Sequence, residues 1–236
     1  LSDDQGTAEI QSIASTPHLT RDPRIKLTTR KLRERHLSSE ESLASFLALH
    51  SSTPVRRLWV VPAFAATIPS SAIDELSMLS GVSLIIPDVD LELVAPVDVS
   101  PAPALATSVT NAITQINVPS LWRRGLTGKG RLICSFDTGV QQSHPALASK
   151  WRGTHADLHS AWFSAVKPDT LPYDKAGHGT HTMGIMVGSV DADSFGVAPG
   201  AEWITAGVID QGKSLNLTIG DILLAFQWAL DPDGNQ

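Results

Sequence analysis

Two short motifs hold the side chains best suited to proton transfer. Asp137-Thr-Gly-Val140 directly follows an apolar run that ends at Phe136, and Gly177-His-Gly-Thr-His-Thr-Met-Gly184 opens an apolar stretch. Ligands of parallel α/β folds bind in the crevice beyond the carboxyl ends of the strands, so a carboxylate at Asp137 is well placed for chemistry. Taken alone, Asp-Thr-Gly also satisfies the requirements of a plain turn. We predict His178, at the start of a helix, as the base of the site.

The remaining histidines are predicted to have structural roles. His181 is expected to face the packed side of the helix that His178 opens. The two histidines lack the i, i+4 spacing and the intervening Glu of a zinc-peptidase helix, so a zinc site is not predicted. The others have no motif around them and are interpreted as hydrogen-bonded structural residues. They are His18, His36, His50, His144, His155 and His159.

The elements around the two motifs read as the opening of a parallel α/β sheet. Strands are predicted at 131–136 and 201–209, with a helix at 180–187 between them. A further helix is predicted from Ile219 to Leu230, where the Thr218 hydroxyl caps the N-terminus and Asp221 favours its positive end. Residues 151–173, between the acid and the base, are interpreted as a surface insertion.

The first half of the chain predicts a separate, small α+β domain over residues 37–94. Its helices are expected to cover one face of an antiparallel sheet. Ser38 and Glu41 form a capping box at the start of the first helix, and Gly81 ends the second. The predicted elements are, in order, a helix at 39–50, a strand at 57–61, a helix at 71–80 and a strand at 82–86.

Two other segments flank this domain. Residues 1–36 are polar and rich in charge, which predicts a largely mobile segment. Residues 95–110 are predicted to be a linker, because small residues surround three prolines there and no periodicity is sustained. These prolines are Pro96, Pro101 and Pro103.

Composition excludes several classes of protein. The 236 residues carry 18 Lys and Arg against 24 Asp and Glu, a net charge of -6, which offers no basic field for nucleic acid. The one cysteine, Cys134, cannot form an internal disulfide. No apolar run approaches the roughly 20 residues of a membrane helix. The chain begins at Leu1 without a signal pattern and stops within a turn, so both ends are interpreted as the ends of a fragment.

Taken together, the motifs resemble the subtilisin-like serine peptidase (subtilase) family. The two motifs stand in the family's order, and Phe195-Gly-Val-Ala-Pro-Gly-Ala201 is similar to its Gly-Val-Ala-Pro segment. The stretches from His178 to Met186 and from Gln227 to Gly234 are similar to the bacillopeptidase F group. From Leu58 through Gly81 to Asp88 the chain resembles the family's inhibitory propeptide, so the likeness covers about residues 40–236.

The resemblance implies a fold and a division of the chain. It implies the start of a subtilisin-like parallel sheet with helices on both faces, over residues 111–236, preceded by the α+β propeptide. It implies a processing cut between about Pro96 and Thr110, and an origin outside the cell. Asp137 then matches the orienting acid of an Asp, His and Ser triad, and His178 matches the base. Polypeptides are the implied substrates and the propeptide is the intramolecular inhibitor. No cofactor is required, and the family's structural calcium cannot be assigned here.

The family's nucleophile is missing from these residues, which leaves alternatives open. No Gly-Thr-Ser occurs among them, so the chain alone is expected to be inactive and the Ser is expected to lie beyond it. One alternative is a catalytically dead binding module that kept Asp137 and His178. Another is a propeptide that acts as an inhibitor or folding chaperone. A longer reading frame that reaches a Gly-Thr-Ser-x-Ala segment would favour the peptidase.

Overall fold

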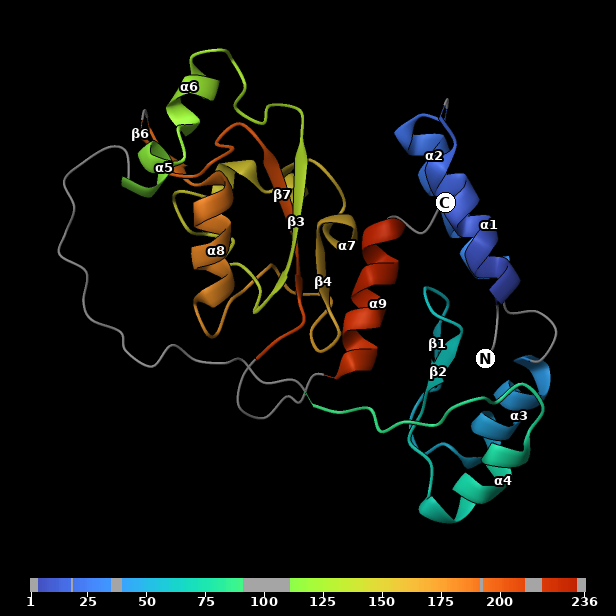
Figure 1. Cartoon of the computed structure of the whole chain (residues 1–236). Coiled ribbons are helices and arrows are strands. Elements are labelled where there is room, and N and C mark those ends of the chain that lie inside the picture. The colour runs from blue at the N-terminus through green and yellow to red at the C-terminus, as the bar shows by residue number, and fades with distance from the viewer. Residues whose placement is uncertain are drawn as a thin grey trace. The chain divides into compact units, whose positions relative to one another are not determined.

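The chain divides into two compact units, and each is described by itself. The first comprises residues 1–89 and 222–236, and the second comprises residues 90–221. The computed structural model (Figure 1) describes residues 4–17, 19–34, 40–90, 111–191, 193–210 and 218–232. The predicted linker at 95–110 and the predicted cap at Ser38 lie outside the described residues.

A parallel sheet of three strands organises the second unit. Its strands are β3 (Leu132–Asp137), β4 (Trp162–Ser164) and β7 (Glu202–Gly207), in the order β3-β7-β4. β7 pairs in parallel with both neighbours, from Leu132 opposite Glu202 to Asp137 opposite Gly207 on one side. All but the first residue of β7 are buried, as expected of a central strand covered on both faces. The predicted parallel α/β sheet is confirmed.

Helices flank this sheet, and α8 (His178–Val187) packs against β3 (Figure 1). Its buried residues Gly179, Met183 and Val187 recur every four positions, which defines one face toward the core. The predicted helix at 180–187 is confirmed and begins two residues earlier. The other elements are α5 (Asn111–Gln115), α6 (Val118–Trp122), η2 (Ala148–Lys150), η3 (Arg152–Thr154), α7 (Leu158–Ala161), β5 (Ser189–Val190) and β6 (Asp193–Ser194).

A lysine closes the C-terminal end of α8. The Lys150 ammonium donates to the Val187 carbonyl and to the Ser189 hydroxyl, both at 2.5 Å, and to the Ala146 carbonyl at 3.5 Å. A cation at this end of a helix is favoured by the partial negative charge of the last carbonyls. Burial lowers the pKa of Lys150, because a desolvated ammonium is disfavoured.

The segment at 151–173 is more than a surface insertion. It contributes β4 to the sheet, and Trp151 and Trp162 are almost fully buried. The Trp203 indole on β7 donates to the Leu147 carbonyl at 2.8 Å and packs near the Trp151 ring. Aromatic burial therefore draws this segment into the core, which the count of residues between the two motifs does not reveal.

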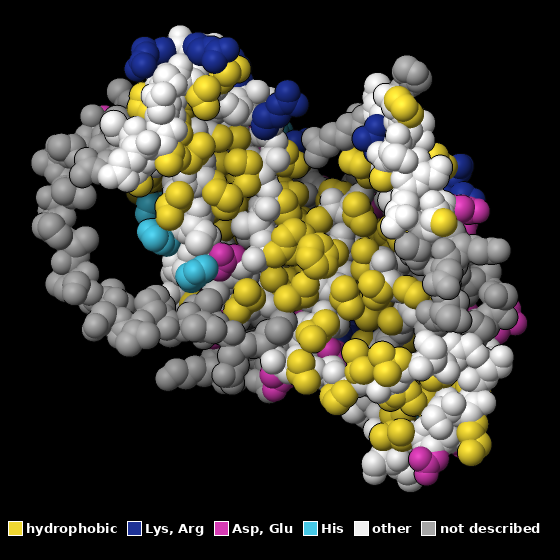
Figure 2. Space-filling model, in the orientation of Figure 1, with side chains coloured by type: hydrophobic (Ala, Val, Ile, Leu, Met, Phe, Trp, Pro, Cys, Tyr) yellow, Lys and Arg dark blue, Asp and Glu magenta, His cyan; other side chains and the backbone are white. Residues whose placement is uncertain are grey.

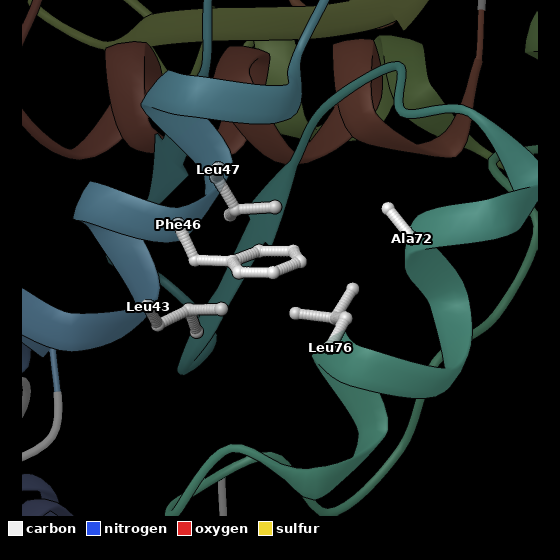
Figure 3. Packing of buried hydrophobic residues seen from close by; sticks show 5 residues of the cluster. All are labelled: Leu43, Phe46, Leu47, Ala72 and Leu76. Atoms are coloured by element: carbon white, nitrogen blue, oxygen red, sulfur yellow. The ribbon is translucent and has the colours of Figure 1, made fainter.

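The first unit packs two helices around an apolar cluster (Figure 3). The helices are α3 (Glu40–His50) and, after the short η1 (Ser70–Ala72), α4 (Ile73–Met78). Both confirm predicted helices. The cluster consists of Leu43, Phe46, Leu47, Ala72 and Leu76. Beside it, β1 (Arg56–Leu58) and β2 (Ala63–Ala65) pair antiparallel.

The strand predicted at 82–86 is wrong. In the described part of this unit the sheet has only β1 and β2, and residues 82–86 belong to no strand. Val82 packs against the apolar cluster, but Leu84 and Ile86 are 74% and 64% exposed. An apolar run forms a strand only where a neighbouring strand accepts its backbone hydrogen bonds, and this condition cannot be read from the run itself.

The segment predicted to be mobile forms two helices instead, α1 (Asp4–Ser15) and α2 (Arg21–Glu34). Lys31 on α2 pairs with Glu9 on α1 at 3.4 Å, and Thr29 and Leu32 are buried. Arg, Lys, Leu and Glu are strong helix formers, so a highly charged segment can still form a helix when some of its side chains are buried.

The last helix, α9 (Ile219–Leu230), has the predicted cap and bounds. The Thr218 amide donates to the Asp221 carboxylate at 2.8 Å, and the Asp221 amide donates to the Thr218 hydroxyl at 3.4 Å. This exchange is a reciprocal capping box. Farther along, the Gln227 amide group contacts Arg57 and Val60, and Asp231 pairs with Arg33. Within the described residues, no helix is both long and apolar enough to cross a bilayer.

We predict that the Cys134 thiol reacts very slowly in the folded chain. Burial raises the pKa of Cys134 from 9.0 to about 12, because the thiolate is poorly solvated inside the protein. That shift lowers the thiolate fraction about a thousandfold near neutral pH, and the thiolate is the reactive form. Iodoacetamide labelling followed by mass spectrometry, in buffer and in urea, measures the difference. Similar rates in the two conditions would contradict the prediction.

Candidate active site

The two residues predicted to share a site meet where β3 ends and α8 begins. Asp137 is the last residue of β3, and His178 is the first residue of α8. Although 41 residues separate them in sequence, His178 Nδ1 lies 2.7 Å from Asp137 Oδ1. The carboxylate is mostly covered, with 14% of its side chain exposed, whereas 42% of the imidazole is exposed. One group is enclosed and its partner faces solvent.

The Asp137 carboxylate is held from two further directions. The Thr138 amide donates to Oδ1 at 2.7 Å, and the Thr182 hydroxyl donates to Oδ2 at 3.0 Å. An ionised carboxylate only accepts, so His178 Nδ1 must donate to it, and the neutral imidazole keeps its free lone pair on Nε2. The pair therefore presents a base toward solvent.

Backbone contact keeps the two motifs together. Gly179 follows His178, and a Cβ at this position would lie 2.0 Å from the Gly139 carbonyl oxygen. Gly139 has φ of +98°, and a Cβ there would lie 2.1 Å from the Tyr173 carbonyl oxygen. Neither glycine can carry a side chain without moving backbone, because real Cβ contacts are longer. Close packing thus requires a glycine at position 139 in the first motif and at position 179 in the second.

The structure corrects the interpretation of His181. This residue is exposed, so it does not face the packed side of α8. Figure 2 shows histidine side chains at the surface in the region of α8. The core face of α8 is defined by Gly179 and Met183, and His181 lies midway between them in sequence. A step of two residues turns about 200° around a helix, which points His181 away from the core.

The other described histidines have local partners. His50 Nδ1 lies 2.9 Å from the Phe46 carbonyl, and its ring stacks on that of Phe46. His144 Nδ1 accepts from the Ala146 amide at 3.3 Å. His155 pairs with Glu202 at 3.3 Å, and His159 pairs with Asp169 at 3.7 Å. His18 and His36 lie outside the described residues.

Sequence reasoning missed four polar residues around the pair. They are Thr138, Asp174, Thr180 and Thr182. Thr182 follows His178 by four residues, so helical spacing alone could have found it. Asp174 precedes the helix by four residues and caps it from a loop. The sequence signals this cap only weakly, through an Asp three residues before Gly177. Among the described residues, no cluster of three His, Cys, Asp or Glu side chains is placed to hold a metal ion.

The part of the chain that carries this site is similar to known proteins. Residues 128–236, which contain both motifs, match the sequence model of the subtilase family. This part of the chain is therefore similar to the subtilase family. Bacillopeptidase F of Bacillus subtilis strain 168 is 39% identical over 128 residues, which are 51% of this chain and 9% of that protein. The likeness to a bacillopeptidase F-like subtilase, predicted from the motifs, is confirmed.

One further relative is similar over a longer stretch of the chain. Subtilisin E of the same strain is 29% identical over 172 residues, which are 72% of this chain and 39% of that protein. The CspB protease of Clostridium perfringens, a solved structure, is 21% identical with a TM-score of 0.37, over 50% of this chain and 29% of that one. The chain spans less than half the length of each of these relatives.

We predict that two substitutions in the first turn of α8 differ in their effect on stability. Gly179→Ala is expected to destabilise the chain by about 1–3 kcal/mol, because the new methyl group meets the Gly139 carbonyl. His181→Ala, its matched control on the exposed side, is expected to change stability by less than about 0.5 kcal/mol. Urea denaturation of both variants measures the difference. Equal midpoints for Gly179→Ala and the unmodified chain would contradict the packing argument.

Proposed function

We propose that this subtilase domain is part of a serine endopeptidase in which Asp137 and His178 activate a serine hydroxyl. The observation that carries the proposal is the 2.7 Å contact between His178 Nδ1 and Asp137 Oδ1, on an imidazole whose Nε2 is left to accept a proton. The match of residues 128–236 to the sequence model of the subtilase family adds support. The serine itself would come from outside these 236 residues.

Each residue then has a defined task in the two proton transfers. As the serine oxygen attacks the peptide carbonyl carbon, His178 Nε2 accepts the hydroxyl proton, and it then gives that proton to the leaving amine. Asp137 holds Nδ1 protonated and stabilises the imidazolium between the transfers. The Thr182 hydroxyl and the Thr138 amide keep the carboxylate from rotating away. A water molecule then attacks the acyl group and gives a proton to His178 Nε2, which passes a proton to the departing serine oxygen.

Polypeptides are the substrates that this chemistry serves. The chain assigns neither the nucleophile nor the donor to the oxyanion, and no Gly-Thr-Ser occurs in it. Both groups are integral to acyl transfer, so the 236 residues alone are expected to be inactive. We also propose, on the family resemblance alone, that the parent acts outside the cell and that any calcium it binds is structural. The chemistry itself uses no cofactor.

We predict that the parent containing the nucleophile loses activity on either substitution at the pair. From other triad enzymes, His178→Ala and Asp137→Asn are each expected to lower kcat by about 10⁴-fold or more, while the fold persists. Hydrolysis of a chromogenic peptide by the purified parent measures the loss, with His181→Ala as the control that keeps most activity.

Two results would refute this assignment. One is turnover by the 236-residue chain that disappears in His178→Ala, because it would require a nucleophile inside the chain. The other is full activity of the parent in both pair variants. An inactive parent whose reading frame contains no Gly-Thr-Ser-like segment would instead favour a binding module.

We further propose that residues 37–94 are the inhibitory propeptide of this enzyme and that residues 95–110 are cut. Support comes from the compact helical cluster of α3 and α4, which gives this part of the chain a core of its own. The three prolines of the segment disfavour helix, and its small side chains suit an extended substrate. The same segment could then bind the active site as a product before release.

We predict that the mature parent begins within or just after residues 95–110. N-terminal sequencing of the secreted or purified active enzyme measures the start directly. The His178→Ala parent serves as the control, and it is expected to keep its N-terminal part because it cannot cut itself. A mature, active enzyme that begins before Leu37 would contradict the precursor arrangement while leaving the Asp137 and His178 pair intact.

A further inference from the structure

We propose that Asp174 is a positioning residue for the Asp137 and His178 pair. Its carboxylate fixes two threonine hydroxyls, and these hold the loop after β3 against the first turn of α8. The catalytic consequence of this role rests on the proposed function. The hydrogen-bond geometry does not rest on it, and can be tested in the chain itself.

Asp174 accepts five hydrogen bonds from groups around the start of α8. Oδ1 accepts from the Thr138 hydroxyl at 2.8 Å, the Ala176 amide at 3.1 Å and the Gly177 amide at 2.8 Å. Oδ2 accepts from the Thr180 amide at 2.8 Å and the Thr180 hydroxyl at 2.6 Å. The carboxylate thus caps a ten-residue helix whose own N-cap, Gly177, has no side chain to do so.

The charge of Asp174 sets the direction of both hydroxyls. An ionised carboxylate can only accept, so each threonine must donate its single hydroxyl proton to it. The lone pairs of the two hydroxyls then accept from backbone amides. The Thr138 hydroxyl accepts from the Gly179 amide at 2.9 Å, and the Thr180 hydroxyl accepts from the Gln141 amide at 2.9 Å. Each hydroxyl therefore bridges the β3 loop and the helix.

These bridges flank the catalytic pair. Thr138 follows Asp137 and Gly179 follows His178, so the contact from Thr138 to Gly179 repeats the contact of the pair one residue later. Thr138 is fully buried, and the bridge cannot be replaced by water without opening the contact of Gly179 with Gly139. The Asp174 carboxylate controls this bridge without touching His178. Its expected effect is on how well Nδ1 of His178 is aligned with Asp137.

An asparagine at position 174 tests the acceptor role with little change of shape. One carboxylate oxygen would become an NH₂ group, which donates. Oδ1 faces three donors and Oδ2 faces two. In either orientation, the NH₂ group of the asparagine would therefore face at least two other hydrogen-bond donors. At least one threonine hydroxyl must then turn, and its bridge to the backbone amide is weakened.

The experiment measures the tautomer of His178 in the 236-residue chain. Histidine labelled with ¹⁵N distinguishes the Nδ1–H form from the Nε2–H form, at a pH well above the ordinary titration range of imidazole. Loss of one signal set in His178→Gln assigns the residue. The unmodified chain is expected to hold mainly the Nδ1–H form. Asp174→Asn is expected to lower the ratio of the two forms by about tenfold, and Asp137→Asn by more.

A matched control separates positioning from simple stability. Val187→Ala removes buried volume at the far end of α8 and is expected to lower the melting temperature while leaving the tautomer ratio unchanged. If Asp174→Asn lowers the melting temperature in the same way and leaves the ratio unchanged, Asp174 is only a helix cap and the proposal is wrong. If Asp174→Asn does not fold, Thr180→Val serves instead, because it removes one bridge and keeps the carboxylate.

The parent enzyme separates this inference from the proposed function. With the nucleophile present, Asp174→Asn is expected to lower kcat with little change in KM, because the residue does not touch substrate. A tautomer shift in the chain, together with an inactive unmodified parent, would uphold the positioning role and refute the peptidase. An active parent whose kcat and tautomer ratio are both unchanged by Asp174→Asn would refute the positioning role alone.

Discussion

The contact between the first turn of α8 and the loop after β3 determines what the site can do. The Gly179 Cα lies so close to the Gly139 carbonyl that an added Cβ would approach its oxygen to 2.0 Å. At that separation the two backbones are in van der Waals contact. His178, one residue before Gly179, and Asp137, two residues before Gly139, are thereby brought within hydrogen-bond reach. His178 Nδ1 and Asp137 Oδ1 therefore meet at 2.7 Å, although each belongs to a different element. A larger residue at Gly179 would separate the helix from the loop after β3, whereas a larger residue at Gly139 would meet the Tyr173 carbonyl.

Two carboxylates lie around the N-terminal end of α8, and within the described part of the chain no lysine or arginine is among the hydrogen-bond partners that hold them. Asp137 accepts from one amide, one hydroxyl and the imidazole, and Asp174 accepts from three amides and two hydroxyls. The partial positive charge of a helix N-terminus adds to these donors. Charge is thus stabilised by fixed dipoles, which do not compete with the imidazole for Asp137 as a mobile cation would.

The sequence predicted the parts of this arrangement that depend on local pattern. β3, β7, α8 and α9 follow from apolar runs, and the Thr218 and Asp221 cap follows from residue types three positions apart. His178 could be placed at the helix start because its motif begins there. The prediction for His181 was wrong because the motif does not show which face of α8 meets the sheet. That face is fixed by Met183 and Val187, which are buried by residues from other parts of the chain.

The remaining misses have the same physical origin. Residues 82–86 lack a neighbouring strand among the described residues, β4 is drawn into the sheet by buried tryptophans, and α2 gains cover for Leu32. Each outcome depends on a partner distant in sequence, and residue propensity and hydrophobic periodicity report only on local sequence. Asp174 belongs to this group as well. Its five donors come together only after the loop, the strand end and the helix have been assembled.

The opposite end of α8 shows why such an assembly can hold a precise distance. There the Lys150 ammonium binds the Val187 carbonyl, while at the start the Asp174 carboxylate binds the Gly177 and Thr180 amides. Each charge faces the helix end of opposite sign, so both favour the same placement of α8. Burial lowers the pKa of Lys150, which means that its three oxygen partners offset only part of the free energy that desolvating the ammonium costs. Lys150 follows β3 and Asp174 follows β4. With both ends fixed to these segments, α8 cannot slide along the sheet without breaking charge-assisted hydrogen bonds. The register of the helix against β3, and hence the alignment of His178 with Asp137, is thereby set at both ends of α8 as well as at the pair itself.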